Sequence, residues 1–487
     1  MRAERPGGAI SRDGYRTEVM AVDPAAGTVI ADGAPAHDLA AALRVRLGGA
    51  RIWHVNSTGT GGGVVELLRS SIGRHHLLGL PAAWLVSNAP AEFFQLTKRI
   101  HHALHGRLSG GPFDGRDAEL YRSAGERQAE SLADYVKVND LVILHDPQLL
   151  PAVPGLVAIG ARVAWRCHIG TRQVSPVTDM VWRMLRPYAC RAYRCVFSLP
   201  EYVPAFLPAE RAAVILPSID PYAAKNREIP AEIRADLLSR IALTADPPPD
   251  AGQAAGARLG YSVHDRLLPG DANVVLQVSR WDPLKDMAGV IDAFITWIAP
   301  STPAHLVLAG PDPADIPDDP EGLRVYQEVA RARGSAPARI RERIHLVVLS
   351  LADFEANALV VNALQRRADV VGQKSLEEGF GLTVAEAMWK YRPVVATRAG
   401  GIGAQIDSGR QGILIEDPAD LEAFGRAVVR LLTDRTLADE LGRAAHRRTE
   451  EEFLADRELA DTLRLYLALL DAAASAAPAS GDGDRGV

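Results

Sequence analysis

Short apolar runs alternate with longer amphipathic segments in two separate stretches of this 487-residue chain. Such alternation is typical of parallel sheets whose strands are joined by helices. No short repeat accompanies it, which argues against a solenoid. We therefore expect an α/β fold of two doubly wound, Rossmann-like domains with a cleft between them. In such sheets ligands bind beyond the carboxyl ends of the strands, so functional residues are expected just after strands.

Apolar runs rich in β-branched residues predict the strands, and amphipathic runs between them predict the helices. In the first stretch we expect strands at 51–56, 84–87, 141–145, 162–167, 195–199 and 213–217, and helices at 92–104 and 119–138. In the second stretch we expect strands at 273–279, 305–309, 344–349, 369–372 and 393–397, and helices at 287–297, 353–365 and 383–391.

A segment poor in apolar residues, 230–268, separates the two stretches. It contains three consecutive prolines, Pro247 to Pro249, beside an Ala/Gly-rich run. Breakers of this kind predict a linker or insertion, with a helix at 232–241 inside it. The two domains are therefore expected at 1–229 and 269–455.

Composition limits the partners and the location of the chain. Lys and Arg number 54 against 60 Asp and Glu, a net charge of −6, so a nucleic-acid partner is not expected. Three cysteines cannot form a disulfide framework or a four-cysteine zinc site. No apolar run is long enough to cross a membrane, and the first residues do not resemble a signal peptide. We expect a cytoplasmic protein whose tail, 473–487, is disordered.

Three consecutive glycines, Gly61, Gly62 and Gly63, follow the first expected strand and precede a helix. Backbone amides without side chains can approach an anion or a sugar closely, and the helix N-terminus adds positive potential. A plain strand-to-helix turn is the alternative interpretation. Three adjacent glycines exceed what such a turn needs, which favours a binding site.

Two cations follow the first strand of the second stretch. Arg280 and Lys285 lie in a loop after the buried run 273–279. A planar guanidinium and a compact ammonium at the carboxyl end of a strand suit a diphosphate. Solvated surface charges are the usual fate of these residue types, so this pair indicates a site only together with other features.

The strongest pattern lies between Gln373 and Trp389. Glu378 occupies a loop, Gly379 and Gly381 flank Phe380, and Glu386 follows on the expected helix. Loop amides and a helix N-terminus can hold phosphate oxygens, and a carboxylate one turn into the helix can accept both hydroxyls of a ribose. Helix capping is the alternative for Glu386, but it does not explain two glycines.

Together these residues resemble the site pattern of a known enzyme family. The pattern Arg280, Lys285, Glu378 and Glu386 resembles the donor site of the family-4 retaining glycosyltransferases, which have the two-domain GT-B fold. The sequence is most similar to the trehalose glycosyltransferring synthases within that group. The motifs shared with those synthases are His-Val-Asn-Ser-Thr with the triple glycine at 54–63, His-Asp-Pro-Gln at 145–148, Trp-Arg-Cys-His-Ile at 165–169, Asn-Ala-Leu-Gln-Arg at 362–366 and Gln-Lys-Ser to Thr-Val at 373–384.

The resemblance implies roles on the donor side. Arg280 and Lys285 would bind the diphosphate and stabilise the leaving group, Glu386 would hold the ribose, and Glu378 would contact the donor sugar. The implied donor-binding set also contains backbone and loop positions: Gly61, Gly62, Gly63, Gly379, Phe380, Gly381, Leu382 and Thr383. A last helix at 456–472 that packs back on the first domain is likewise implied.

On the acceptor side the resemblance implies that His168 lies beside the donor sugar and the reacting carbon. Asp146 would bind acceptor hydroxyls, and the implied acceptor set is completed by Asn56, Gln148 and Arg172. From the residues alone, His168 is equally a structural histidine and Asp146 a turn residue. Arg172 departs from the synthases, which carry an acidic residue near this position, and it also fits retaining trehalose phosphorylases. Acceptor identity therefore stays open.

The implied reaction moves glucose from a nucleotide sugar to free glucose, reversibly, with retention, giving α,α-trehalose. No cofactor is expected to be required, since two cations and a helix N-terminus already supply positive potential. ADP-, UDP- and GDP-glucose all remain possible donors. No metal site is expected, and Mg²⁺ would be accessory. The resemblance also implies a homodimer. Alternatives are trehalose phosphorolysis, transfer to another sugar or cyclitol, nucleotide-sugar epimerisation and an inactive nucleotide-sugar-binding regulator.

Overall fold

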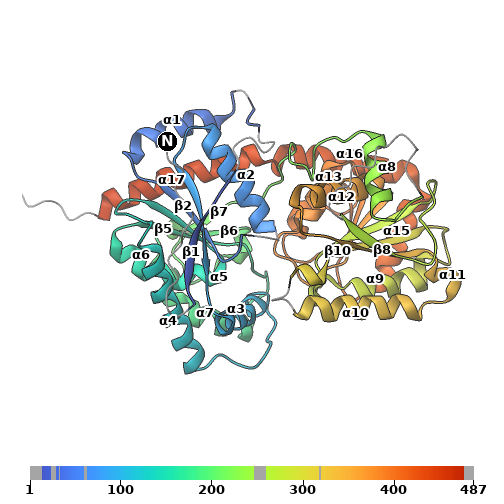
Figure 1. Cartoon of the computed structure of the whole chain (residues 1–487), viewed down its shortest axis with the longest axis horizontal. Coiled ribbons are helices and arrows are strands. Elements are labelled where there is room, and N and C mark those ends of the chain that lie inside the picture. Colours follow the sequence, from blue (N-terminus) through green and yellow to red (C-terminus); the bar gives the residue numbers. More distant parts are fainter. Residues whose placement is uncertain are drawn as a thin grey trace, which may run out of the picture. The chain divides into compact units, whose positions relative to one another are not determined.

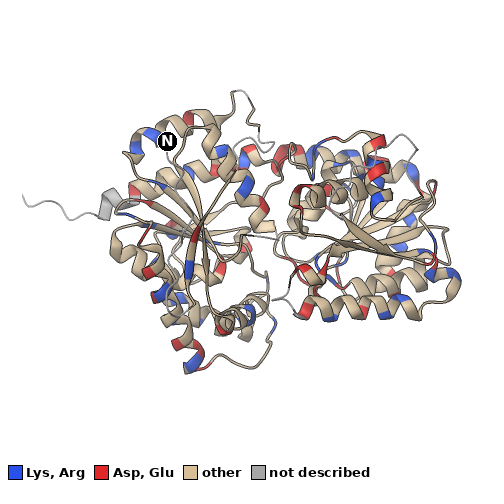
Figure 2. Ribbon diagram, in the orientation of Figure 1, with Lys and Arg blue, Asp and Glu red and all other residues tan. Residues whose placement is uncertain are grey.

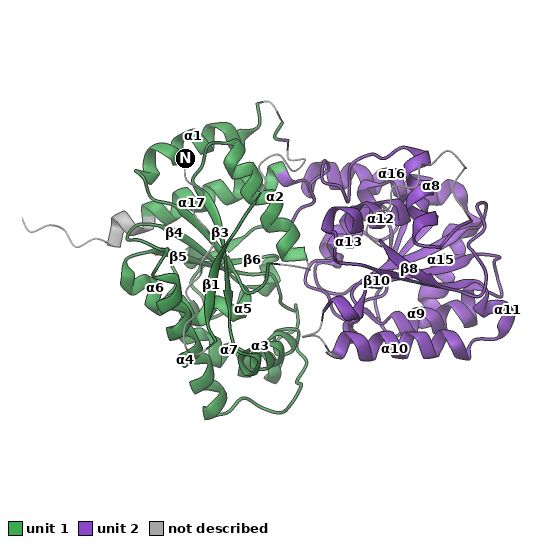
Figure 3. Cartoon of the chain, viewed as in Figure 1, with its two compact units in different colours: residues 1–26, 30–216, 456–487 green, residues 27–29, 217–455 purple. Residues whose placement is uncertain are grey.

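The computed structural model describes residues 14–22, 29–31, 33–59, 63–245, 259–316 and 320–476. The chain divides into two compact units (Figure 3). Unit 1 contains residues 1–26, 30–216 and 456–487, and unit 2 contains residues 27–29 and 217–455. After the long stretch 217–455 of unit 2, the chain returns to unit 1 for its final helix.

Unit 1 is built on a seven-stranded sheet in the order β1-β3-β2-β4-β5-β6-β7 (Figure 1). All its pairings are parallel except that of β1 with β3. The strands are β1 (Arg16–Met20), β2 (Ile52–Asn56), β3 (Ala82–Asn88), β4 (Leu141–His145), β5 (Arg162–Cys167), β6 (Arg194–Phe197) and β7 (Ala212–Val214). The order reverses between β2 and β4, which makes their carboxyl ends the switch point where ligands bind in doubly wound sheets.

Helices cover both faces of this sheet. Apolar side chains of α1 (Pro35–Leu47), α2 (Gly63–Leu77) and α17 (Ala455–Ala476) form one core with the sheet. The remaining helical segments of unit 1 are α3 (Ala91–Leu104), α4 (Gly115–Leu132), α5 (Asp146–Leu149), η1 (Leu150–Ala152), α6 (Val153–Ile159), α7 (Pro176–Ala189), η2 (Pro200–Tyr202) and η3 (Ala209–Arg211). Figure 1 shows α3, α4 and α7 on the face of the sheet opposite α1 and α17.

Unit 2 repeats the plan with the order β14-β13-β12-β9-β10-β11-β8. Only the edge strand β8 is antiparallel to its neighbour. The strands are β8 (Gly260–Val263), β9 (Val274–Val278), β10 (His305–Pro311), β11 (Ile344–Leu349), β12 (Val370–Gln373), β13 (Val394–Thr397) and β14 (Ile413–Ile415). Here the order reverses between β9 and β12.

Two apolar cores lie on the two faces of this sheet, and successive residues of β9 alternate between them. One face is covered mainly by α8 (Ala231–Arg240), α12 (Phe354–Arg367), α13 (Leu382–Trp389) and α14 (Ile402–Gln405). The other carries α9 (Met287–Ala293), the π-helical η5 (Phe294–Ile298), α10 (Pro320–Ser335) and α15 (Leu421–Thr433). The remaining segments are η4 (Pro283–Lys285), η6 (Pro313–Asp315), α11 (Ala338–Arg341) and α16 (Arg435–Glu452).

The expected linker at 230–268 needs correction. Residues 231–240 form α8, whose Leu237 and Leu238 are buried in the core of unit 2. Residues 260–263 form β8, paired with β11. The segment's Pro- and Ala-rich middle, 246–258, lies outside the described residues, as do 477–487 of the expected disordered tail. Apolar residues on either side of the breaker-rich run therefore join the core of unit 2, and the long stretch of unit 2 begins at residue 217, whereas the sequence predicted 269.

Positive and negative side chains are interspersed along the helices of both units (Figure 2). In the described part of the chain, no helix combines the length and apolarity that a membrane crossing requires. The last helix, α17, is held on unit 1 by polar contacts as well as apolar ones. Arg74 pairs with Asp456, and Arg166 pairs with Glu458 at 2.5 Å.

Candidate active site

The two loops that follow β9 and β12 carry the predicted donor-site residues of unit 2. These strands are neighbours at the reversal of strand order, so their carboxyl ends deliver Arg280 and Glu378 to the same edge of the sheet. The Leu376 N–H donates to the Leu284 carbonyl at 2.7 Å, which ties the two loops together. Arg280 and Glu378 therefore both follow strands, as the sequence predicts for functional residues, and their binding roles stay a prediction.

Lys285 and Glu378 form an ion pair inside this edge. Lys285 Nζ lies 2.6 Å from Glu378 Oε1, and the two side chains are only 13% and 12% exposed. The Lys285 backbone carbonyl accepts a 2.8 Å hydrogen bond from Gln277 Nε2 on β9. The ammonium is therefore held in place and largely withdrawn from water, where a charged contact is stronger than at the surface.

The Gln-Lys-Ser motif orients the Glu378 carboxylate. Ser375 Oγ donates to Glu378 Oε2 at 3.1 Å, and Gln373 Nε2 donates to Ser375 Oγ at 3.0 Å. Thr383 Oγ1 donates to Gln373 Oε1 at 3.0 Å. The motif thus forms a buried polar network around one carboxylate, a function that the sequence alone did not reveal.

The Arg280 side chain is far more exposed to solvent than that of Lys285. It is 52% exposed, and its Nη2 lies 3.1 Å from Asp282 Oδ2. Asp282 also accepts a 2.8 Å hydrogen bond from the Leu284 N–H. An exposed ion pair of this kind contributes little stability, so the guanidinium can turn towards a more highly charged anion at small cost.

The loop before α13 requires glycine at position 381. Gly381 has φ +87°, and an added Cβ would lie 2.9 Å from Ile402 Cγ1. Gln405 Nε2 donates to the carbonyls of Phe380 and Gly381, at 2.5 and 3.2 Å. In the described part of the chain, the N–H groups of Phe380, Gly381 and Leu382 donate to no protein group. Three free amides at a helix N-terminus form an anion-binding arrangement.

Glu386 is buried within a second polar cluster. Its Oε2 accepts from Gln365 Nε2 at 3.2 Å, and its Oε1 lies 3.8 Å from Lys225 Nζ. Lys390 Nζ donates to Gln365 Oε1 at 2.7 Å and to the Glu386 carbonyl at 3.1 Å. The Glu386 side chain is only 4% exposed, so a ribose can reach it only if neighbouring groups move.

The Asn-Ala-Leu-Gln-Arg motif explains how Lys225 is placed. Asn362 Nδ2 donates to the carbonyls of Ala224 and Arg227, at 2.9 and 2.8 Å. Arg366 Nη2 donates to the Asn226 carbonyl at 3.0 Å. The motif therefore pins the segment that carries Lys225 against Glu386. Sequence reasoning missed Lys225 and Lys390, and their only signal was that lysines are rare in this chain.

The triple glycine of unit 1 is described only in part. Gly61 and Gly62 lie outside the described residues, and Gly63 is the first residue of α2. Asn56, at the end of β2, turns its amide inward: Nδ2 donates to the Thr58 carbonyl at 3.1 Å and Oδ1 accepts from the Ser57 N–H at 2.8 Å. Asn56 thus shapes its own loop, and acceptor binding by its side chain stays a prediction.

Asp146 and His168 are brought together at the end of β4 and β5. Asp146 Oδ1 accepts the His168 N–H at 2.9 Å, while the Asp146 carbonyl accepts from Trp165 Nε1 at 2.9 Å. Asp146 has φ +62°, a strained conformation for a residue other than glycine. Burial raises the pKa of the Asp146 carboxyl to about 6. Strain held by surrounding hydrogen bonds is common at functional sites.

Gln148 and Arg172 have different surroundings. Gln148 Oε1 is buried and accepts no hydrogen bond within the described residues, so its capacity to accept one is unused. Arg172 is 34% exposed and lies 3.4 Å from Glu201 Oε1. The Glu201 carboxylate partly offsets the positive charge of Arg172. Arg172 is the residue that departs from the synthase pattern, and for that reason the identity of the acceptor stays open.

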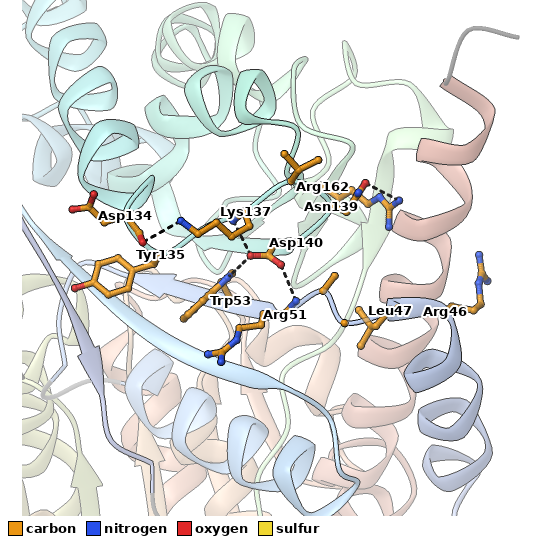
Figure 4. A pocket seen from close by; sticks show the side chains of 14 residues that line it. Arg46, Leu47, Arg51, Trp53, Asp134, Tyr135, Lys137, Asn139, Asp140 and Arg162 are labelled. Carbon is orange, nitrogen blue, oxygen red and sulfur yellow. Dashed lines mark hydrogen bonds between the residues drawn. The ribbon is translucent and has the colours of Figure 1, made fainter. Parts of the chain in front are cut away.

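A pocket of about 750 Å³ lies at the opposite end of the unit 1 sheet from these residues (Figure 4). It is lined by residues at or just before the amino ends of β2, β4 and β5, together with the end of α1. There the Asp140 carboxylate accepts the Trp53 ring N–H at 2.9 Å and the Arg51 N–H at 2.8 Å. These bonds fix the sheet's amino edge.

The part of the chain that is described holds no group of three or more His, Cys, Asp or Glu arranged for a metal ion. Metal-independent chemistry stays a prediction.

Two family models match the chain. "Trehalose synthase, N-terminal domain" matches residues 54–204, and "Glycosyl transferases group 1" matches residues 263–448. A trehalose synthase from Rubrobacter xylanophilus is 34% identical over 88% of this chain and 92% of its own length. A trehalose phosphorylase from Pleurotus pulmonarius is 25% identical over 82% of this chain and 55% of its own.

Solved structures share the fold at low sequence identity. A UDP-forming α,α-trehalose-phosphate synthase from Burkholderia xenovorans, in complex with glucose-6-phosphate, superposes with a TM-score of 0.63. It is 15% identical, and the match covers 87% of this chain and all of that one. With two helix-flanked seven-stranded sheets, the chain has the expected architecture of two Rossmann-like domains, the GT-B fold.

Proposed function

The chain belongs to the trehalose synthase family of GT-B glycosyltransferases, and from this premise we propose that it transfers glucose from a nucleoside diphosphate glucose to free glucose. The product is α,α-trehalose, and the configuration at the transferred carbon is retained. The observation that carries this proposal is the set of anion-binding groups at the switch point of unit 2, namely Lys285 and the three free amides of 380–382.

These groups suit the leaving diphosphate. Each charge-assisted hydrogen bond to a phosphate oxygen is worth roughly 1.5–3 kcal/mol. Lys285 would turn from Glu378 towards the diphosphate, and the half-exposed Arg280 would add a second cation. Glu378, released from the ammonium, would accept hydroxyl groups of the donor glucose, while Glu386 would accept those of the ribose once neighbouring groups move.

The transfer needs no protein base. The acceptor hydroxyl oxygen forms its bond to the anomeric carbon on the face that the diphosphate leaves. The hydroxyl proton passes to the departing phosphate oxygen, and the bonding pair leaves with the diphosphate. Catalysis then consists of positioning both sugars and stabilising the developing negative charge on the leaving group. Asp146, His168 and Gln148 are proposed to bind the sugars from unit 1.

Trehalose phosphorolysis is the second candidate, favoured by the likeness to a trehalose phosphorylase and by the presence of Arg172. The 3.4 Å contact of Arg172 with Glu201 weighs against Arg172 as a dedicated phosphate ligand. Transfer to a different sugar or cyclitol uses the same donor chemistry and is separated from the main proposal by an acceptor screen.

We further propose that no cofactor is required, that Mg²⁺ is accessory, and that the partners are small sugars. A homodimer and a cytoplasmic location remain predictions. Mass measurement in solution tests the assembly, and activity in the presence of a chelator tests the metal.

The deciding experiment is a donor panel. ADP-, UDP- and GDP-glucose are each incubated with free glucose, and trehalose and released nucleoside diphosphate are both measured. The proposal expects equal amounts of the two products with at least one donor. A parallel reaction of trehalose with inorganic phosphate and no nucleotide should give no glucose 1-phosphate. Glucose 1-phosphate there, with no product from any donor, would replace synthesis by phosphorolysis.

A further inference from the structure

A continuous line of hydrogen bonds runs through unit 1 from its last helix to the candidate sugar site. Tyr466 Oη on α17 lies 2.9 Å from His54 Nε2 on β2. His54 Nδ1 lies 3.1 Å from His145 Nε2 at the end of β4, and His145 Nδ1 lies 2.9 Å from His168 Nε2 after β5. The three rings also stack in sequence, with centroids 5.4 and 5.2 Å apart.

The topology explains how this line forms. β2, β4 and β5 are adjacent parallel strands. His54 lies two residues before the end of β2. His145 is the last residue of β4, and His168 is the first residue after β5. Each histidine thus lies further towards the carboxyl edge than the previous one. The line therefore leads from the core beneath α17 to the edge where ligands bind.

Burial favours the neutral form of all three rings. His54 and His145 are each 2% exposed. Burial lowers the pKa of all three histidines well below the usual value, and the nearby Arg166 guanidinium lowers it further. Arg166 is itself held by Glu458 at 2.5 Å. A neutral imidazole carries a single N–H, so each ring within the line donates once and accepts once.

The direction of the line follows from its buried end. Within the described part of the chain, the Tyr466 hydroxyl has one hydrogen-bond partner, His54 Nε2. A buried phenol that does not donate leaves its proton unsatisfied, so Tyr466 donates. His54 then carries its proton on Nδ1 and donates to His145, which in turn donates from Nδ1 to His168 Nε2. The remaining proton of His168 is therefore on Nδ1.

We propose that Tyr466, His54 and His145 are positioning residues that fix His168 as the Nδ1–H tautomer. His168 then presents a hydrogen-bond donor to its ligand and cannot act as a base. That this ligand is a sugar rests on the proposed function; the tautomer does not. A donor suits a sugar hydroxyl oxygen, which can accept a hydrogen bond, and it agrees with a mechanism in which the leaving group takes the proton. His168 Nδ1 has no partner among the described residues.

The first test needs no variant. The full chain is labelled with ¹⁵N-histidine, and the two ring nitrogens of each histidine are observed by long-range ¹H–¹⁵N correlation at pH 7.5. Signals of the line are assigned by single His→Gln substitutions among the 13 histidines. The proposal expects His168 with a protonated Nδ1 and an unprotonated Nε2. A protonated Nε2, with or without a proton on Nδ1, overturns it.

The second test removes the phenol. Tyr466→Phe should convert His168 to a mixture of tautomers, because the line loses the group that sets its direction. Tyr135→Phe is the matched control, since Tyr135 donates its hydroxyl to the Thr17 carbonyl at 3.3 Å elsewhere in unit 1. The control should leave the His168 signals unchanged. An unchanged tautomer in Tyr466→Phe overturns the proposal.

Activity supplies an independent readout. Asn can place an amide N–H near the position of Nδ1, whereas Gln reaches the position of Nε2. His168→Asn should therefore retain roughly tenfold more turnover than His168→Gln, the equivalent of one hydrogen bond. Equal losses or the reverse order contradict the donor role. If no donor gives product in the wild type, the proposed function fails while the tautomer result still decides this inference.

Discussion

Lys285 Nζ lies 2.6 Å from Glu378 Oε1 at the point where the strand order of unit 2 reverses. The two residues are 93 positions apart in the sequence, and two neighbouring strands bring them together. In the absence of ligand each charge neutralises the other, so neither is left uncompensated in a poorly solvated site. When the donor binds, we expect Lys285 to contact the diphosphate and Glu378 to contact the glucose, in place of their contact with each other.

Replacing Lys285 by Met should lower kcat/KM by about 10²–10³-fold, or about 3–4 kcal/mol, because the leaving group loses an ammonium. The Glu378 carboxylate is also left without its partner. Steady-state kinetics with the best donor measure the effect. Lys137→Met, an exposed lysine of unit 1, serves as the control and should be neutral. Near-wild-type turnover in Lys285→Met would reject the leaving-group role.

Glu386→Gln should weaken binding of the nucleoside diphosphate about ten- to hundredfold while leaving the KM for the acceptor unchanged. The neutral amide accepts ribose hydroxyls less strongly than the carboxylate does. Titration calorimetry with the diphosphate gives the affinity. Glu355→Gln, whose side chain is 68% exposed, is the matched control. An unaltered diphosphate affinity would remove Glu386 from the ribose site.

Gly381→Ala should destabilise unit 2 more than Gly409→Ala does. Both glycines have positive φ, +87° and +84°, so each substitution costs about 1–2 kcal/mol of backbone strain. At Gly381 the new Cβ would also lie 2.9 Å from Ile402 Cγ1, whereas at Gly409 it meets open space. Urea unfolding of the two variants measures the difference. Equal losses would show that the Gly381 loop has room to adjust.

Acid should destabilise the fold below pH 6.5. Burial lowers the pKa of His54, His145 and His168, and that of His75 to about 4. Between the folded and unfolded pKa values the unfolded chain binds more protons. Stability is therefore complete above pH 6.5 and falls below it by up to about 1.4 kcal/mol per pH unit for each histidine. Asp146, with its pKa raised to about 6, opposes this by one proton.

Urea unfolding at pH 7.5 and pH 5.5 measures this acid effect. Wild-type protein should lose stability between the two values, and His145→Gln should lose less because one of the titrating rings is absent. A stability that is the same at both pH values, or that rises on acidification, would contradict the burial of neutral histidines.

The central strands β4 and β5 were predicted from the sequence to the residue, whereas the edge strands β1, β8 and β14 were not predicted. β4 and β5 lie where expected because strands buried on both faces read as continuous apolar runs. β1 and β8 were missed because they are short and contain only one fully buried residue each, so they do not read as continuous apolar runs. Their antiparallel pairing depends on partners more than 60 residues away, which local patterns do not report.

The candidate site shows the same division. Arg280, Lys285 and Glu378 could be singled out from the sequence because chemistry-bearing side chains follow strands at one edge of a doubly wound sheet, and their roles in donor binding stay a prediction. Lys225 could not, because its contact with Glu386 depends on hydrogen bonds from Asn362 and Arg366. The triple glycine could be singled out by composition, but Gly61 and Gly62 lie outside the described residues.

The anchoring of the leaving group is tested most directly by a crystal structure with the nucleoside diphosphate bound. The account predicts diphosphate oxygens within hydrogen-bond distance of Lys285 Nζ and of the N–H groups of Phe380, Gly381 and Leu382. It also predicts that Lys285 has left Glu378. A diphosphate bound elsewhere in the molecule, with the Lys285–Glu378 pair intact, would contradict it.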